Sequence, residues 1–195
     1  MKRIFDIICS LIILSIFFPI GLILSIIIAT TSRGGVFYRQ ERIGLNGVPF
    51  QLLKFRSMAV NSDQKGTLTV GMRDSRITPI GYFIRKYKLD EFPQFVNVLK
   101  GDMSIVGPRP EVREFVDLYT PEQRQILNVK PGITDVASLE YFEENALLAK
   151  SDNPRQTYID EIMPAKIELN KIYLRNPTLA NDIKIMWKTF RRIIG

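Results

Sequence analysis

The chain has 195 residues, of which 46% are hydrophobic and 24% charged, and its formal net charge is +7. This length suits one compact domain with an appendage, and the composition excludes a wholly disordered chain. With no histidine and a single cysteine, the sequence also excludes a Ser-His-Asp triad, a disulfide within the chain and any metal site built on His or Cys, so a metal would need oxygen ligands.

The first predicted element is an uncharged apolar run of 26 residues, from Ile7 to Ser32. Because about 20 such residues cross a bilayer core, one reading is a single membrane-spanning helix. Pro19 favours another reading, since it removes a backbone N–H and divides the run into two arms, each about one leaflet long. Basic residues flank both ends, which favours a re-entrant helix with both ends on the cytoplasmic face. The residues alone leave both readings open.

A β-hairpin is predicted next, because Asn46-Gly47 separates two strand-like runs at 36–42 and 48–56. Alternation along the second run places Lys54 and Arg56 on one strand face. Two cations in this arrangement indicate either ligands for a phosphate or an ordinary solvated face.

The remainder reads mostly as helices separated by loops. Residues 57–76 are polar and predict a loop, whereas the C-terminal residues 178–195 predict a basic amphipathic helix. Such a helix lies on a membrane surface or packs on the core of its own domain. Other helices are expected at 80–87, 89–101, 111–118, 121–127 and 155–174.

Asp90 and Glu91 are the first candidates for chemistry. Acidic residues that begin a helix often serve only as caps. Here Arg85, Lys86 and Lys88 surround the pair with positive charge, which would attract phosphate and keep a carboxylate ionised. An ionised carboxylate can attack phosphorus, and a neighbouring acid can hold a metal or move a proton.

Arg109 is the second candidate. Prolines on both sides restrict its backbone, and a guanidinium suits contact with phosphate through two hydrogen bonds. The alternative is a purely structural turn.

Several motifs in order closely resemble the bacterial sugar transferase family, the small monotopic phosphoglycosyl transferases. The resemblance covers nearly the whole chain, including the apolar segment with its central proline. The motifs are Lys54-Phe55-Arg56-Ser57-Met58, Leu89-Asp90-Glu91-Phe92-Pro93-Gln94, Asn97 to Ser104, Val106-Gly107-Pro108-Arg109-Pro110 and Lys130-Pro131-Gly132-Ile133-Thr134.

The resemblance implies an enzyme that moves a sugar-1-phosphate from a UDP-sugar to polyprenyl (undecaprenyl) phosphate and releases UMP. Asp90 would be the nucleophile that carries a covalent phosphosugar and the residue that contacts Mg²⁺, with Glu91 second in the catalytic dyad. Arg109 would hold phosphate, and Lys54, Arg56 and Arg85 are the other expected substrate-binding residues. The reaction would begin the membrane stage of a bacterial glycoconjugate pathway.

We therefore expect a helix-rich α+β monotopic membrane protein with a re-entrant helix, a small β-hairpin and amphipathic interfacial helices. The expected division is a re-entrant helix at 1–33, a cytoplasmic catalytic domain at 34–177 and the C-terminal helix at 178–195. The expected location is the cytoplasmic face of the bacterial inner membrane. Membrane lipids are expected partners, a homo-oligomer is allowed, and nucleic acid is not expected.

One departure from the family pattern concerns Asp135, which follows Thr134 where many members have glycine. It would either alter donor choice or cap a turn. Two rival functions also remain: a membrane-tethered module that binds anionic lipid without catalysis, and a bitopic glycosyltransferase that releases UDP.

Overall fold

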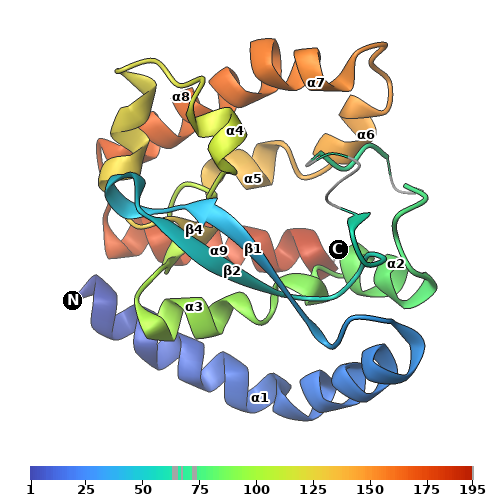
Figure 1. Ribbon diagram of the computed structural model, residues 1–195. Helices are drawn as coiled ribbons and strands as arrows, with labels where there is room; N and C mark the ends of the chain where they lie inside the picture. The colour runs from blue at the N-terminus through green and yellow to red at the C-terminus, as the bar shows by residue number, and fades with distance from the viewer. Residues whose placement is uncertain (63–65, 67, 72–73, 195) are drawn as a thin grey trace.

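The N-terminal helix α1, Lys2–Thr31, runs along one side of the molecule, beneath α3, Gln94–Lys100 (Figure 1). In this computed structural model, residues 1–62, 66, 68–71 and 74–194 are described. Among them α1 is the helix that is long and apolar enough to cross a membrane. The expected break at Pro19 does not divide it into two helices, because a proline removes one hydrogen bond while its neighbours persist. The helix is instead bent (Figure 1).

Both ends of α1 are attached to the rest of the protein. Near its start, the Lys2 ammonium pairs with Asp182, and the Asp6 carboxylate accepts a hydrogen bond of 2.8 Å from Ser104. Near its end, Leu24 and Ile28 are buried in a cluster with Phe55 and Ile84. Asp6 is an acidic residue in an apolar helix, and its burial is explained by hydrogen bonds from the Ser104 hydroxyl and from the Ile105 main-chain N–H.

The predicted β-hairpin is present. Strands β1, Phe37–Ile43, and β2, Pro49–Phe55, pair antiparallel, with Tyr38 opposite Lys54. The 3₁₀ turn η1, Leu45–Gly47, makes the connection longer than a two-residue turn, and Asn46 and Gly47 both take positive φ angles there. These are the residue types that tolerate such angles, which is why the sequence marks the turn correctly.

A second, parallel pair of strands was not predicted. Strands β3, Ser104–Val106, and β4, Gly132–Thr134, lie side by side although 25 residues separate them in sequence. Gly107 and Gly132 approach so closely that a Cβ on Gly132 would lie 2.2 Å from the Gly107 nitrogen. The two glycines therefore allow this pairing, which fixes the start of the Pro108-Arg109-Pro110 loop.

The helices largely follow the predictions, with three corrections. The expected helix at 89–101 is a separate 3₁₀ turn, η3, followed by α3; the one at 121–127 is the 3₁₀ helix η4; and α5 and α6 were missed. Each is only a few residues long, so it lacks the repeated periodicity on which sequence prediction depends. Their bounds are α2 Pro79–Lys86, η3 Leu89–Glu91, α4 Arg113–Val116, η4 Gln123–Asn128, α5 Val136–Glu140, α6 Glu144–Leu148, α7 Pro154–Thr157, the π-helical η5 Tyr158–Ile162, α8 Met163–Leu174 and α9 Leu179–Ile194.

Helix α9 confirms that the C-terminal segment packs on its own domain, whereas its place on a membrane surface stays a prediction. Asp182 and Ile185 are buried against the domain, and α9 contacts β3, β4 and α5. Its adjacent face, with Ile183, Trp187 and Phe190, is exposed. The protein is thus a helix-rich α+β structure with one small hairpin and an apolar N-terminal helix. The division at 1–33, 34–177 and 178–195 stays a prediction.

Candidate active site

A cavity of about 520 Å³ lies between the hairpin, α2, η3, the loop that carries Arg109 and the start of α6 at Glu144. This volume suits a ligand of sugar-nucleotide size. Every candidate site residue from the sequence lines it: Lys54, Arg56, Arg85, Asp90, Glu91 and Arg109. Residues spread over more than 50 positions in sequence are therefore brought to one cavity.

Asp90 lies in the 3₁₀ turn η3 and is 4% exposed. Its carboxylate makes no hydrogen bond or ion pair with any residue that the structure describes. Burial raises the pKa of Asp90, the positive charge of Lys54 opposes this, and the negative charge of Glu91 adds to it. Desolvation therefore outweighs the neighbouring cations in setting the direction of the shift, and the prediction that these cations keep the carboxylate ionised stays a prediction.

The side chain of Glu91 is held by two cations. The Arg109 guanidinium contacts both of its carboxylate oxygens, with Arg109 Nη1 3.2 Å from Oε2, and Lys54 Nζ lies 3.6 Å from Oε1. Burial raises the pKa of Glu91, but the charges of Arg109 and Lys54 outweigh it and hold the pKa well below its usual range. Glu91 is therefore ionised near neutral pH and cannot serve there as a proton donor.

The pKa values of Lys54 and Arg109, the two cations beside Glu91, shift in opposite directions. Burial lowers the pKa of Lys54 to about 8, although Glu91 opposes the shift. The negative charge of Glu91 raises the pKa of Arg109. Lys54 is thus a cation that can lose its charge within an accessible pH range, and Arg109 is a permanent one.

The other two predicted binding residues differ in how they are held. Arg56 donates from Nε to the Gly35 carbonyl oxygen at 2.9 Å and from Nη2 to the Phe37 carbonyl oxygen at 3.2 Å. Arg85 lies at the end of α2, close enough to Asp90 for its positive charge to oppose part of the upward shift in the Asp90 pKa. Both line the cavity.

A metal ion at this site would depend on few protein ligands. Within the described parts of the chain, no group of three or more Asp, Glu or Cys side chains gathers as a metal site. Glu91 is occupied by Arg109 through both oxygens. Asp90, by contrast, lines the cavity with no hydrogen bond or ion pair to the residues that the structure describes. Mg²⁺ is often held by one or two carboxylates together with substrate phosphates. Asp90 therefore fits a Mg²⁺ ligand and Glu91 does not.

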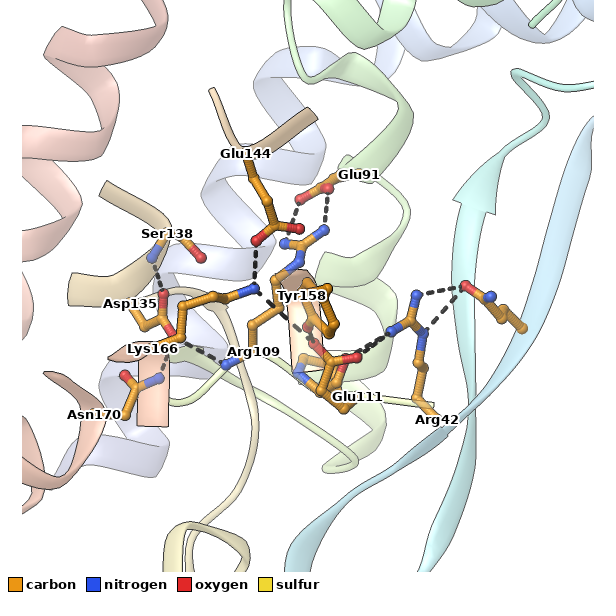
Figure 2. Close-up of polar contacts among 12 residues, drawn as sticks. Arg42, Glu91, Arg109, Glu111, Asp135, Ser138, Glu144, Tyr158, Lys166 and Asn170 are labelled. Atoms are coloured by element: carbon orange, nitrogen blue, oxygen red, sulfur yellow. Dashed lines mark hydrogen bonds and ion pairs between the residues drawn. The ribbon is translucent and has the colours of Figure 1, made fainter. Parts of the chain in front are cut away.

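A second group of charged side chains in the same cavity was not singled out from the sequence. We call it the Lys166 cluster; it comprises Arg42, Glu111, Glu144, Tyr158 and Lys166 (Figure 2). Two signals pointed to it: Glu111 directly follows Pro110, and strand alternation places Tyr38, Gln40 and Arg42 on one face of β1.

Asp135 anchors the loop that presents Arg109. Its carboxylate is fully buried and accepts a hydrogen bond from the Arg109 main-chain N–H at 3.0 Å and another from Asn170 Nδ2 at 2.8 Å. It also caps α5 by accepting from the Ser138 N–H. Of the two roles predicted for Asp135, the structure thus favours capping a turn over direct contact with the sugar donor. It also shows a hydrogen bond from the Arg109 main chain, which the sequence did not predict.

Asp135→Ala should lower the free energy of unfolding by about 2–4 kcal/mol, because three N–H donors, all buried or partly buried, would lose their acceptor. The measurement is thermal unfolding of the purified protein in detergent. Asp152→Ala, on an exposed loop, is the matched control and should leave the melting temperature unchanged. Equal melting temperatures for the two variants would contradict the anchoring role.

The whole chain is similar to proteins of a known family. A model of the family described as "Bacterial sugar transferase" matches residues 1–195. The chain is 39% identical to a UDP-N-acetylgalactosamine-undecaprenyl-phosphate N-acetylgalactosaminephosphotransferase of Aeromonas hydrophila, with 99% of this chain and 43% of the relative aligned. It is 37% identical to a UDP-glucose:undecaprenyl-phosphate glucose-1-phosphate transferase of Klebsiella pneumoniae, over 96% of this chain and 39% of the relative.

The chain therefore spans about two fifths of the length of those two relatives. It covers 87% of the "Uncharacterized sugar transferase EpsL" of Bacillus subtilis, at 36% identity over 100% of this chain. The family match extends over the hairpin, the cavity and both terminal helices. From this match and these identities, the chain belongs to the bacterial sugar transferase family.

Proposed function

We propose that the protein transfers a sugar-1-phosphate from a UDP-sugar to polyprenyl (undecaprenyl) phosphate and releases UMP, as the first membrane step of a bacterial glycoconjugate pathway. The observation that carries this proposal is Asp90: a carboxylate with no hydrogen bond or ion pair to another described residue, in a cavity of about 520 Å³ lined with cations. The relatives support it, since their names describe sugar-phosphate transfer to undecaprenyl phosphate.

In the proposed mechanism, an Asp90 oxygen attacks the phosphorus that carries the sugar. The bond from that phosphorus to the UMP oxygen breaks, and UMP leaves with the electron pair. An oxygen of polyprenyl phosphate then attacks the same phosphorus and displaces the Asp90 carboxylate, which gives a polyprenyl diphosphate sugar. The raised pKa of Asp90 makes its ionised carboxylate more basic and so a stronger nucleophile.

The cations around Asp90 would stabilise the charge that develops on phosphate. Arg109 is held by Glu91 through both of its carboxylate oxygens, so its orientation is set before substrate binds. The Lys54 ammonium is also paired with the Glu91 carboxylate. We infer that Glu91 acts mainly by positioning these two cations, because its low pKa prevents proton transfer near neutral pH. Arg56 and Arg85 would contact the rest of the donor diphosphate.

Mg²⁺ is the cofactor that we propose, with Asp90 as its protein ligand. When bound, it would neutralise charge on the donor diphosphate and on the leaving UMP. Oxygen ligands from the substrate would complete its coordination, since Mg²⁺ is often held by one or two carboxylates together with substrate phosphates.

We propose that the protein is monotopic, with α1 re-entrant and the catalytic domain on the cytoplasmic face of the inner membrane. The tethers at Lys2 and Asp6 and the packing of Leu24 and Ile28 attach both ends of α1 to one domain. A helix that crossed the bilayer would separate its ends by about 30 Å of lipid, and one domain could not hold both. Exposed apolar side chains on α1, α2 and α9 would face lipid.

The deciding experiment is to incubate the purified protein with Mg²⁺, undecaprenyl phosphate and a panel of UDP-sugars, and to identify the nucleotide released. UMP supports the proposal. UDP would indicate a glycosyltransferase that moves the sugar alone, and no turnover with any donor would favour a lipid-binding module.

The pH dependence of donor use should reflect Lys54. Since burial lowers the pKa of Lys54 to about 8, its positive charge is present below that pH and is lost as the pH rises through it. We expect kcat/KM for the donor to fall above about pH 8, because kcat/KM reports groups of the free enzyme. Lys54→Arg should move this alkaline limb to higher pH. An unchanged limb in Lys54→Arg would assign it to another group.

The orientation of α1 can be tested on intact cells. A single cysteine in a short extension before Met1, in a Cys9→Ser background, should resist a membrane-impermeant thiol reagent, because the Lys2–Asp182 pair holds the N-terminus at the domain. The same cysteine should be labelled after the cells are permeabilised, which serves as the control. Labelling from outside intact cells would restore the bitopic reading.

A further inference from the structure

The Lys166 cluster is built from buried charges that the proposed mechanism does not use. The Lys166 ammonium lies 2.7 Å from a Glu144 oxygen and 4.0 Å from a Glu111 oxygen, and its side chain is 10% exposed. Glu111 also accepts a hydrogen bond from the Tyr158 hydroxyl and lies 3.5 Å from Arg42 Nη1. Buried ion pairs contribute little net stability, since desolvation of the charges offsets their attraction. Stability alone therefore gives no reason to place them beside a cavity.

The charge of this cluster differs from that of the cavity wall around Asp90. Near Asp90, the cations Lys54, Arg85 and Arg109 suit a diphosphate. In the cluster, two carboxylates balance Lys166 and Arg42. Carboxylates repel phosphate but accept hydrogen bonds from neutral hydroxyl groups, while an ammonium donates to hydroxyl oxygens. The cluster is thus suited to a neutral ligand rich in hydroxyl groups.

The cluster also adjoins the residue that would hold the reacting phosphate. Glu144 lies near Arg109 (Figure 2), where its negative charge acts on Arg109, and Lys166 is paired with Glu144. In the proposed reaction, Asp90 attacks the phosphate that carries the sugar. Groups next to Arg109 are therefore closer to the sugar than to the base at the other end of the donor.

We propose that the Lys166 cluster is the subsite for the hexose of the donor, with Glu144 and Lys166 as specificity-determining residues. This inference rests on the proposed function and deepens it. Glu144 is the most accessible charged member, with a side chain 24% exposed, so its carboxylate is the acceptor best placed for sugar hydroxyls. The ribose of the nucleotide carries hydroxyl groups too, and the experiment separates the two.

The experiment uses the full chain with Mg²⁺ and undecaprenyl phosphate. It measures kcat/KM from UMP release for UDP-glucose, UDP-galactose, UDP-N-acetylglucosamine and UDP-N-acetylgalactosamine. It also measures the inhibition constant of UDP, which carries the base, ribose and diphosphate but no hexose. The variants are Glu144→Gln, which removes the charge, and Glu144→Asp, which keeps the charge but shortens the side chain. Glu168→Gln, on the exposed side of α8, is the matched control.

Glu144→Gln should lower kcat/KM for the preferred donor about tenfold or more. Both Glu144 variants should also change the ranking of the four donors. The inhibition constant of UDP should stay within about threefold of wild type, which also shows that the cavity remains folded, and Glu168→Gln should behave as wild type.

Two results would overturn the inference while leaving the proposed function in place. One is an equal loss for UDP and for all four donors, which would assign the cluster to the nucleotide or to folding. The other is unchanged donor ranking in both Glu144 variants. If wild-type protein releases no UMP from any donor, the proposed function itself fails, and the hexose subsite fails with it.

Discussion

Asp90→Asn should abolish sugar-phosphate transfer, with a loss of about 10³-fold or more in kcat. An amide has nearly the size of a carboxylate but cannot form the bond to phosphorus. Asp90 makes no hydrogen bond or ion pair with other described residues, so its replacement breaks no contact that the fold requires. We therefore expect the melting temperature to stay close to that of wild type, or to rise as the buried charge is removed.

The measurement is UMP release with donor and acceptor present. Asp117→Asn, at an exposed position after α4, is the matched control and should retain full activity. Intact mass spectrometry of wild-type protein with donor alone should show a phosphosugar adduct that Asp90→Asn lacks. Near-native turnover in Asp90→Asn would exclude Asp90 as the nucleophile.

Arg109→Lys should lower kcat/KM by about 10- to 100-fold, although the positive charge is kept. The Arg109 guanidinium contacts both oxygens of Glu91, and its main-chain N–H is fixed by Asp135. A lysine ammonium has no planar pair of donors, so it cannot contact both oxygens of Glu91 in this way. It therefore cannot present a phosphate-binding group in a defined orientation. The loss should therefore concern orientation rather than charge.

Arg113→Lys, at an exposed position on α4, provides the matched control for this change and should leave kcat/KM unaltered. The two variants are compared by donor kinetics at saturating acceptor. If Arg109→Lys matches wild type, Arg109 contributes charge only, and the contact with Glu91 has no kinetic role.

Features that depend on neighbouring residues were predictable from the sequence. The apolar run of α1, the Asn46-Gly47 turn of the hairpin and the three- and four-residue periodicity of α9 each report on a local backbone preference. The family resemblance, carried by ordered motifs, was confirmed by the family match over residues 1–195. The candidate site residues of three of those motifs, among them Lys54, Asp90 and Arg109, then proved to line one cavity.

Only the tertiary structure decided how these pieces act on one another. Strand β3 pairs with β4, and the Asp135 carboxylate accepts a hydrogen bond from the Arg109 main chain. Both contacts join segments about 26 residues apart, and no sequence periodicity predicts such contacts. The direction of the Asp90 pKa shift likewise depended on burial, which reverses what the nearby cations in the sequence suggest. The same is true of the Lys166 cluster, whose members come from β1, the loop after Arg109, α6, η5 and α8. Sequence determines which charges a chain carries, whereas desolvation and long-range contact determine what each charge does.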